Sequence, residues 1–120
     1  MSFQKWMDLY EKIEKLEEEI IKGREEWMKQ GVGSGFSYYL YQRRVEGYRQ
    51  EWDELLTVGE VKSTDRFREE LLEIVSKRLQ DIRRQGMINR DDFPKEKEVA
   101  KQAEKIIQEA ESLLDYCNNI

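Results

Sequence analysis

The hydrophobic positions of the chain repeat with the period of an α-helix. Near the N-terminus, Trp6, Ile13 and Ile20 recur every seven residues. Farther along, apolar side chains follow one another at alternating steps of three and four, which is typical of a helix that buries one narrow stripe. That stripe consists of Tyr38, Tyr41, Val45, Tyr48, Trp52 and Leu55. No stretch alternates at every second residue as a strand would, so the pattern predicts an all-α protein.

Capping residues and glycines indicate where these helices begin and end. Ser2 can cap the first helix, and the glycine-rich residues 31–35 separate it from the second. Gly86 occupies a position typical of a helix C-terminus, so residues 87–94 are expected to form a connector. The sequence therefore predicts four helices, at about residues 2–30, 36–57, 64–85 and 94–117.

Short connections make consecutive helices antiparallel neighbours. We therefore predict an antiparallel four-helix bundle built from two helical hairpins, as a single domain of residues 1–120. The alternative is a pair of hairpins whose core is completed only by homodimerisation. Within the first hairpin, residues whose numbers sum to about 65 are expected to lie opposite each other. This register predicts that Gly23 leaves room for Tyr41, a small residue against a large one.

The composition of the chain indicates which cellular compartment it suits and which kinds of partner it would not attract. The chain has 120 residues, 39% of them charged, and a net charge of −5, which argues against indiscriminate attraction to a polyanion or a membrane surface. The single cysteine, Cys117, cannot form an internal disulfide. No apolar run approaches the roughly 18 residues of a membrane span, and the N-terminal residues lack the apolar core of a signal peptide. We expect a cytoplasmic protein, either of a cell or encoded by a virus.

Catalysis is not supported by the residue types present. The chain has no histidine, the commonest general base and metal ligand. Cys117 lies on an apolar line, where a buried small side chain is expected instead of a nucleophile. The glycines of residues 31–35 match no nucleotide-binding motif, because no strand precedes them and no Gly-Lys-Ser/Thr follows. We therefore predict a protein that is not an enzyme and uses no cofactor or metal.

Aromatic and apolar side chains that lie off the main seams favour binding of another protein. Tyrosine, tryptophan and arginine dominate the energetic centres of protein interfaces. Phe3 and Trp6 are included because they are expected to extend beyond the end of the second helix, where nothing in the first hairpin covers them. The residues predicted to form such a contact surface are Phe3, Trp6, Tyr10, Tyr39, Arg43 and Arg44. An adaptor or assembly subunit fits this interpretation, and so does a small inhibitor of the phage or plasmid kind that occupies an enzyme's surface. Homo-oligomerisation remains open.

A basic cluster near the end of the third predicted helix supports an alternative function, binding of RNA or DNA. Residues 77–90 hold five basic side chains and one acidic side chain within an acidic protein. Cations at a helix C-terminus also have a purely structural explanation, since they interact favourably with the helix dipole. The basic residues in question are Lys77, Arg78, Arg83, Arg84 and Arg90.

Overall fold

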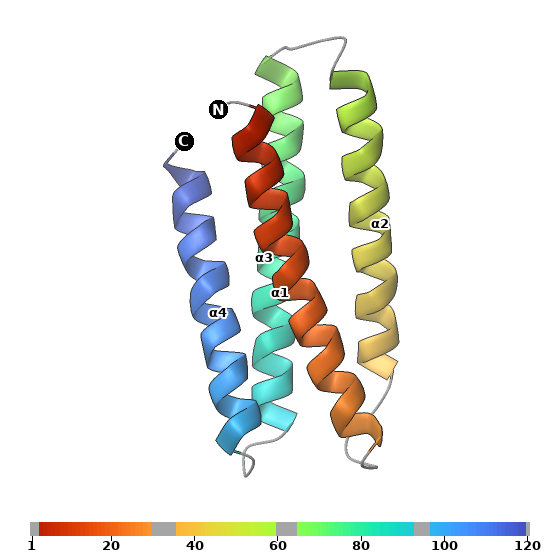
Figure 1. The fold of residues 1–120 in the computed structure, drawn as a ribbon, viewed down its shortest axis with the longest axis vertical. Helices are drawn as coiled ribbons and strands as arrows, with labels where there is room; N and C mark the ends of the chain where they lie inside the picture. The colour runs from red at the N-terminus through yellow and green to blue at the C-terminus, as the bar shows by residue number, and fades with distance from the viewer. Residues whose placement is uncertain (1–2, 30–35, 60–64, 93–96, 120) are drawn as a thin grey trace.

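The computed structural model describes residues 3–29, 36–59, 65–92 and 97–119, and side chains within 4–26, 38–57, 66–92 and 97–119. These residues form four helices, which run in alternating directions and confirm the predicted antiparallel four-helix bundle (Figure 1). The helices are α1 (Phe3–Lys29), α2 (Phe36–Gly59), α3 (Asp65–Asp92) and α4 (Lys97–Asn118).

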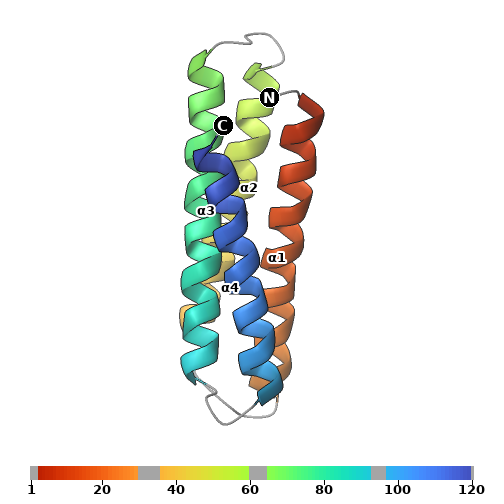
Figure 2. The same cartoon turned by 90° about the vertical axis from the view of Figure 1, so that its left-hand side faces the viewer.

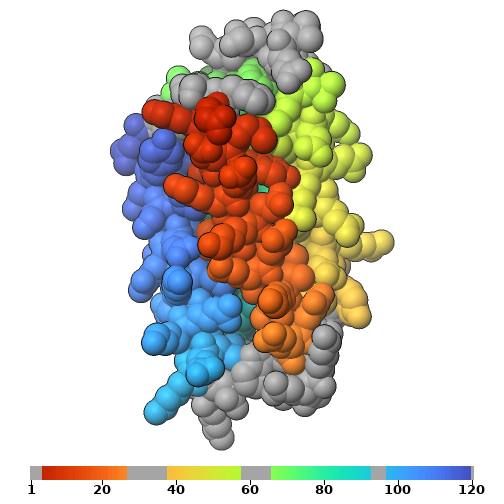
Figure 3. All heavy atoms as spheres, viewed as in Figure 1, coloured from red at the N-terminus to blue at the C-terminus, as the bar shows by residue number. Residues whose placement is uncertain are grey.

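The bundle is elongated and flattened, with backbone extents of 49 × 25 × 17 Å. α3 and α4 form its closest pair, and α1 crosses in front of α3 between α2 and α4 (Figures 1 and 2). α1 and α3 therefore touch across the bundle, whereas α2 and α4 lie on opposite sides of them. Figure 3 shows α1 filling the middle of this face, with α4 and α2 along its two edges.

One apolar core extends across all four helices. In the first hairpin, the Tyr10 ring lies 5.2 Å and the Trp6 ring 6.3 Å from the ring of Trp52, measured between centroids. The predicted register pairs Trp52 with Ile13, so these two ring contacts lie nearer the N-terminus of α1 than that rule places them. Glu17 and Arg49, whose numbers sum to 66, lie 3.6 Å apart and agree with the predicted register. The buried side chains of the core are Trp6, Leu9, Ile13, Leu16, Ile20, Tyr41, Val45, Trp52, Leu71, Ile74, Val75, Leu79, Ile82, Ile106, Ala110 and Cys117.

The predicted end of the third helix at residue 85 is wrong, because α3 continues through Gly86 to Asp92. Gly86 is buried, and a Cβ atom built there would lie 2.9 Å from Cγ1 of Ile107. The glycine lets α4 approach α3 closely, so its role is packing and not helix termination. Residues 87–92 of the predicted connector instead belong to α3, and residues 93–94 lie outside the described part of the chain.

The explanation proposed for Gly23 is also wrong. The nearest atom to a Cβ built at this glycine is Oε1 of Gln102 on α4, at 3.6 Å, and Tyr41 is not among the atoms within 4 Å. Gly23 faces α4 because α1 is rotated so that its stripe is shared between α2, α3 and α4. A pairing rule for one hairpin cannot include the third and fourth helices.

Two glycines offer a matched test of this packing. Gly86→Ala is expected to lower the free energy of unfolding by about 1–3 kcal/mol, because the added methyl group overlaps Ile107. Gly47 is exposed with no atom within 4 Å of a built Cβ, so Gly47→Ala is expected to stabilise the helix by about 0.5–1 kcal/mol. Urea unfolding at equilibrium measures both.

A second measurement shows whether Ile107 is the cause. If it is, the effects of Gly86→Ala and Ile107→Ala will not add, since removing Cγ1 of Ile107 removes the overlap. Additive losses, or a Gly86→Ala variant as stable as Gly47→Ala, would contradict this account of the close approach of α3 and α4.

Candidate protein-binding surface

A small apolar patch lies exposed near the beginning of α2. Tyr39 is 61% exposed and Leu40 is 41% exposed, and Arg43, one turn later on the same side of the helix, is also exposed. Among the side chains that the structure describes, Tyr116 is the other exposed large hydrophobic residue, and it lies near the end of α4. We call Tyr39, Leu40 and Arg43 the α2 patch.

A buried tyrosine supports this patch from behind. Tyr38 is 4% exposed, and its hydroxyl donates a hydrogen bond to Glu25 of α1 and accepts one of 2.9 Å from Gln42 Nε2. The ring of Tyr39 packs edge-on against Tyr38, with centroids 5.6 Å apart. Burial, followed by the hydrogen bond to Glu25, raises the pKa of Tyr38 well above the usual value for a phenol. Tyr38 therefore remains a neutral, anchored support for Tyr39.

Arg44 has a structural role next to the patch. Its Nε and Nη2 atoms donate to the carboxylate of Asp81 on α3 at 2.7 and 3.0 Å. The same carboxylate accepts hydrogen bonds from the Tyr48 hydroxyl and from Arg84, each at 3.0 Å. Burial and the bond to Asp81 raise the pKa of Tyr48 to about 12. Arg44 thus joins α2 to α3, and only part of its side chain remains exposed.

The three residues predicted on α1 do not join this patch. Trp6 is 4% exposed and belongs to the core. Tyr10 is half-buried between Trp52 and the guanidinium of Arg78, which lies 4.8 Å from its ring centroid. Phe3 begins α1, and its side chain lies outside the described part of the structure. The beginning of α1 is also at the opposite end of the bundle from the beginning of α2 (Figure 1).

Sequence reasoning missed a buried ion pair at the centre of the bundle. Arg78 of α3 and Glu17 of α1 have side chains at most 1% exposed, and the Arg78 Nε and Nη2 atoms donate to the two carboxylate oxygens of Glu17. Arg49 of α2 lies 3.6 Å from the same carboxylate. Burial raises the pKa of Glu17, although the hydrogen bond and charge of Arg78 oppose this effect. One carboxylate and two arginines therefore connect α1, α2 and α3.

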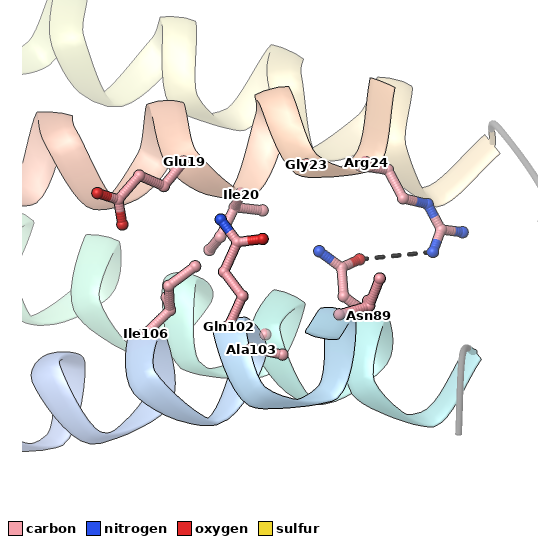
Figure 4. A pocket seen from close by; sticks show the side chains of 10 residues that line it. Glu19, Ile20, Gly23, Arg24, Asn89, Gln102, Ala103 and Ile106 are labelled. Atoms are coloured by element: carbon pink, nitrogen blue, oxygen red, sulfur yellow. Dashed lines mark hydrogen bonds between the residues drawn. The ribbon is translucent and has the colours of Figure 1, made fainter. Parts of the chain in front are cut away.

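A second buried arginine connects α1 to the end of α3. Arg24 is 1% exposed, and its Nη1 and Nη2 atoms lie 3.5 Å from Asn89 Oδ1 and 2.8 Å from an Asp92 oxygen. A cavity of about 20 Å³ adjoins Arg24 and Asn89 between α1, α3 and α4 (Figure 4). Gly23 and Ala103 also line it. It has room for about one water molecule and is too small for an organic ligand.

The sequence does contain a signal for these buried charges. Arg78 falls on the apolar face of its helix, four residues before Ile82 and next to Leu79, and Glu17 stands between Ile13 and Ile20. A charged residue at a core position is rare unless it is paired. The sequence pattern shows that a charged residue interrupts each apolar face, but only the tertiary structure shows which residue pairs with it.

The predicted nucleic-acid cluster is divided among three places. Lys77, Arg83 and Arg84 line one groove between α2 and α3. Arg78 points into the bundle towards Glu17, so it is not available to a phosphate. Arg90 pairs with Glu104 of α4 and with the neighbouring Asp91. The structure therefore brings together three of the five residues.

The described part of the chain offers no evidence for a metal site or a membrane-spanning helix. Within it, no group of three or more Cys, Asp or Glu side chains is placed to hold a metal ion, and no helix is both long and apolar enough to span a membrane. Cys117 is buried as expected, and burial raises the pKa of its thiol.

Comparisons with models of protein families, with curated proteins and with solved structures find no match to this chain.

Proposed function

We propose that the protein is a non-catalytic helical module that binds another protein through the α2 patch. The observation that supports this proposal is the exposure of Tyr39 and Leu40 side by side, next to Arg43, on a surface that is otherwise mostly charged. Aromatic residues and arginine are the commonest energetic centres of protein interfaces. Because Tyr38 already holds the ring of Tyr39, binding would order few additional side chains.

The proposal includes two versions. In the first, the protein is an adaptor or an assembly subunit, and its partner keeps its activity when bound. In the second, it is a small inhibitor, of the kind that phages and plasmids encode, and it blocks an enzyme by occupying its surface. The activity of the captured partner, with and without the bound protein, distinguishes them.

The test is affinity capture from the source organism with three forms of the protein: wild type, Tyr39→Ser/Leu40→Ser, and Tyr116→Ser. The last is a matched control, because Tyr116 is 47% exposed but lies on α4, outside the patch. A partner retained by wild type and by the control is expected to bind the double variant at least about 10-fold more weakly, as loss of an interface centre predicts. Equal retention by all three forms would contradict a role of the α2 patch.

A further inference from the structure

The face formed by α2 and α3 carries two adjoining grooves of opposite charge. Towards the end of α2 and the beginning of α3, the acidic groove is lined by Glu51, Glu54, Glu70 and Glu73. Towards the other end of the same two helices, the basic groove is lined by Lys77, Arg83 and Arg84. Lys77 lines both grooves and marks the boundary between them.

The charged side chains that line the two grooves are exposed or half-buried, with the exception of Asp81. The one carboxylate of the basic groove, Asp81, is 6% exposed and accepts hydrogen bonds from Arg44, Tyr48 and Arg84, and the Arg84 side chain is still 62% exposed. In the acidic groove, the ion pairs of Glu73 with Lys77 and of Glu70 with Arg66 are exposed and have N–O distances of 3.6 and 3.3 Å. Such surface pairs contribute little to stability, so their members can exchange partners readily.

The two grooves are placed so that a two-fold rotation exchanges them. On α3, Glu70 and Glu73 lie before Lys77 by about as many residues as Arg83 and Arg84 lie after it. At 1.5 Å per residue, each group lies about 9 Å from an axis that crosses the face near Lys77. Because the two faces must meet, this axis lies in the plane of the face and runs across the helices. The rotation therefore places α3 of one copy on α3 of the other with its two ends exchanged, and the acidic groove lies on the basic groove.

We infer that this face binds a second copy of the same chain, with the acidic groove of each copy on the basic groove of the other. Glu70 and Glu73 of α3 then face Arg83 and Arg84 of the second copy, and the two-fold axis makes the same contact twice. Half-buried Leu55 in the acidic groove and half-buried Met87 in the basic groove add apolar area to the contact. Opposite charges select this pairing over a parallel arrangement, which would place like charges together.

Charge reversal makes a sharp test of this inference by sedimentation velocity at low and high salt. Wild type is expected to form dimers that weaken as salt rises. Arg83→Glu/Arg84→Glu places acid against acid, and Glu70→Lys/Glu73→Lys places base against base. Each variant alone is expected to dimerise at least about 100-fold more weakly than wild type.

An equimolar mixture of the two variants is expected to form a heterodimer, because it restores the opposite charges. This rescue separates loss of the interface from misfolding. Lys12→Glu/Lys15→Glu is the matched control, since it changes the net charge as Arg83→Glu/Arg84→Glu does but lies in the groove between α1 and α4. The control is expected to dimerise as wild type does.

Three results would overturn the inference. The first is a wild type that stays monomeric at low salt up to about 100 µM, far above the dissociation constants of specific dimers. The second is a mixture of folded variants that stays monomeric. The third is a monomeric wild type that binds mixed-sequence oligonucleotides at low salt and loses this binding in Arg83→Glu/Arg84→Glu, which would assign the basic groove to nucleic acid. The α2 patch variants change none of these readouts.

Discussion

Replacing Arg78 with methionine is expected to lower the free energy of unfolding by about 3–5 kcal/mol, the usual cost of leaving a buried charge without its partner. Methionine fills much of the volume of the arginine side chain, but it leaves the carboxylate of Glu17 buried and without its bidentate partner. Arg49, at 3.6 Å, compensates only part of that charge. Equilibrium unfolding in urea measures the loss.

Two control variants isolate the ion pair from the change in side-chain shape. Glu17→Met/Arg78→Met replaces both charges with apolar groups and is expected to recover most of the lost stability, because no buried charge remains. Arg43→Met makes the same change on the surface, outside both grooves of the α2–α3 face, and is expected to alter stability by no more than about 0.5 kcal/mol. If Arg78→Met were as stable as Arg43→Met, the pair would contribute nothing to the fold.

The defect of Arg78→Met is expected to depend on pH. Removing the guanidinium removes the main influence that lowers the pKa of Glu17, so the raised pKa rises further. A carboxyl whose pKa is higher in the folded than in the unfolded state stabilises the fold when it is protonated, and this stability is lost as pH rises through the folded pKa. The stability difference between Arg78→Met and the double methionine variant should therefore be largest near neutral pH and shrink on acidification towards the usual value of 4.5.

Replacing Trp52 with alanine is expected to cost about 3–5 kcal/mol, as for other large buried aromatic residues. Trp52 is 1% exposed, and its ring contacts those of Trp6 and Tyr10. Alanine would leave a cavity between α1 and α2, the two helices that this aromatic cluster holds together. Urea unfolding measures the cost, and near-ultraviolet circular dichroism should show the loss of the tryptophan pair.

Phenylalanine at position 52 is the informative control. Within the described residues, Nε1 of Trp52 has no hydrogen-bond partner, so Trp52→Phe loses ring volume without breaking a described hydrogen bond. It is expected to be clearly less destabilising than Trp52→Ala. Tyr39→Ala, which removes an exposed ring, should change stability by no more than about 0.5 kcal/mol. A small effect of Trp52→Ala would show that the aromatic cluster is not central to the core.

The sequence by itself determined the number of helices, their type and most of the buried stripe of α1 and α2. Ile13, Tyr41, Val45 and Trp52 were predicted in the seam and are all buried. This works because the helical period is a local property: residues three and four apart always share a face. The same reasoning placed Tyr39 off the seam of α2, and it is the most exposed large hydrophobic side chain that the structure describes.

Only the tertiary structure decided which residues are buried by helices distant in the sequence. Glu17 and Arg78 are separated by 61 residues, so no local pattern could pair them. Glycine often ends a helix, but Gly86 lies inside α3. Ile107 of α4 occupies the space that a side chain at position 86 would need. Tryptophan is common at protein interfaces, yet Trp6 is buried against Trp52. The period of a helix is fixed by its own backbone, whereas the environment of each side chain is fixed by the neighbours that the bundle brings to it.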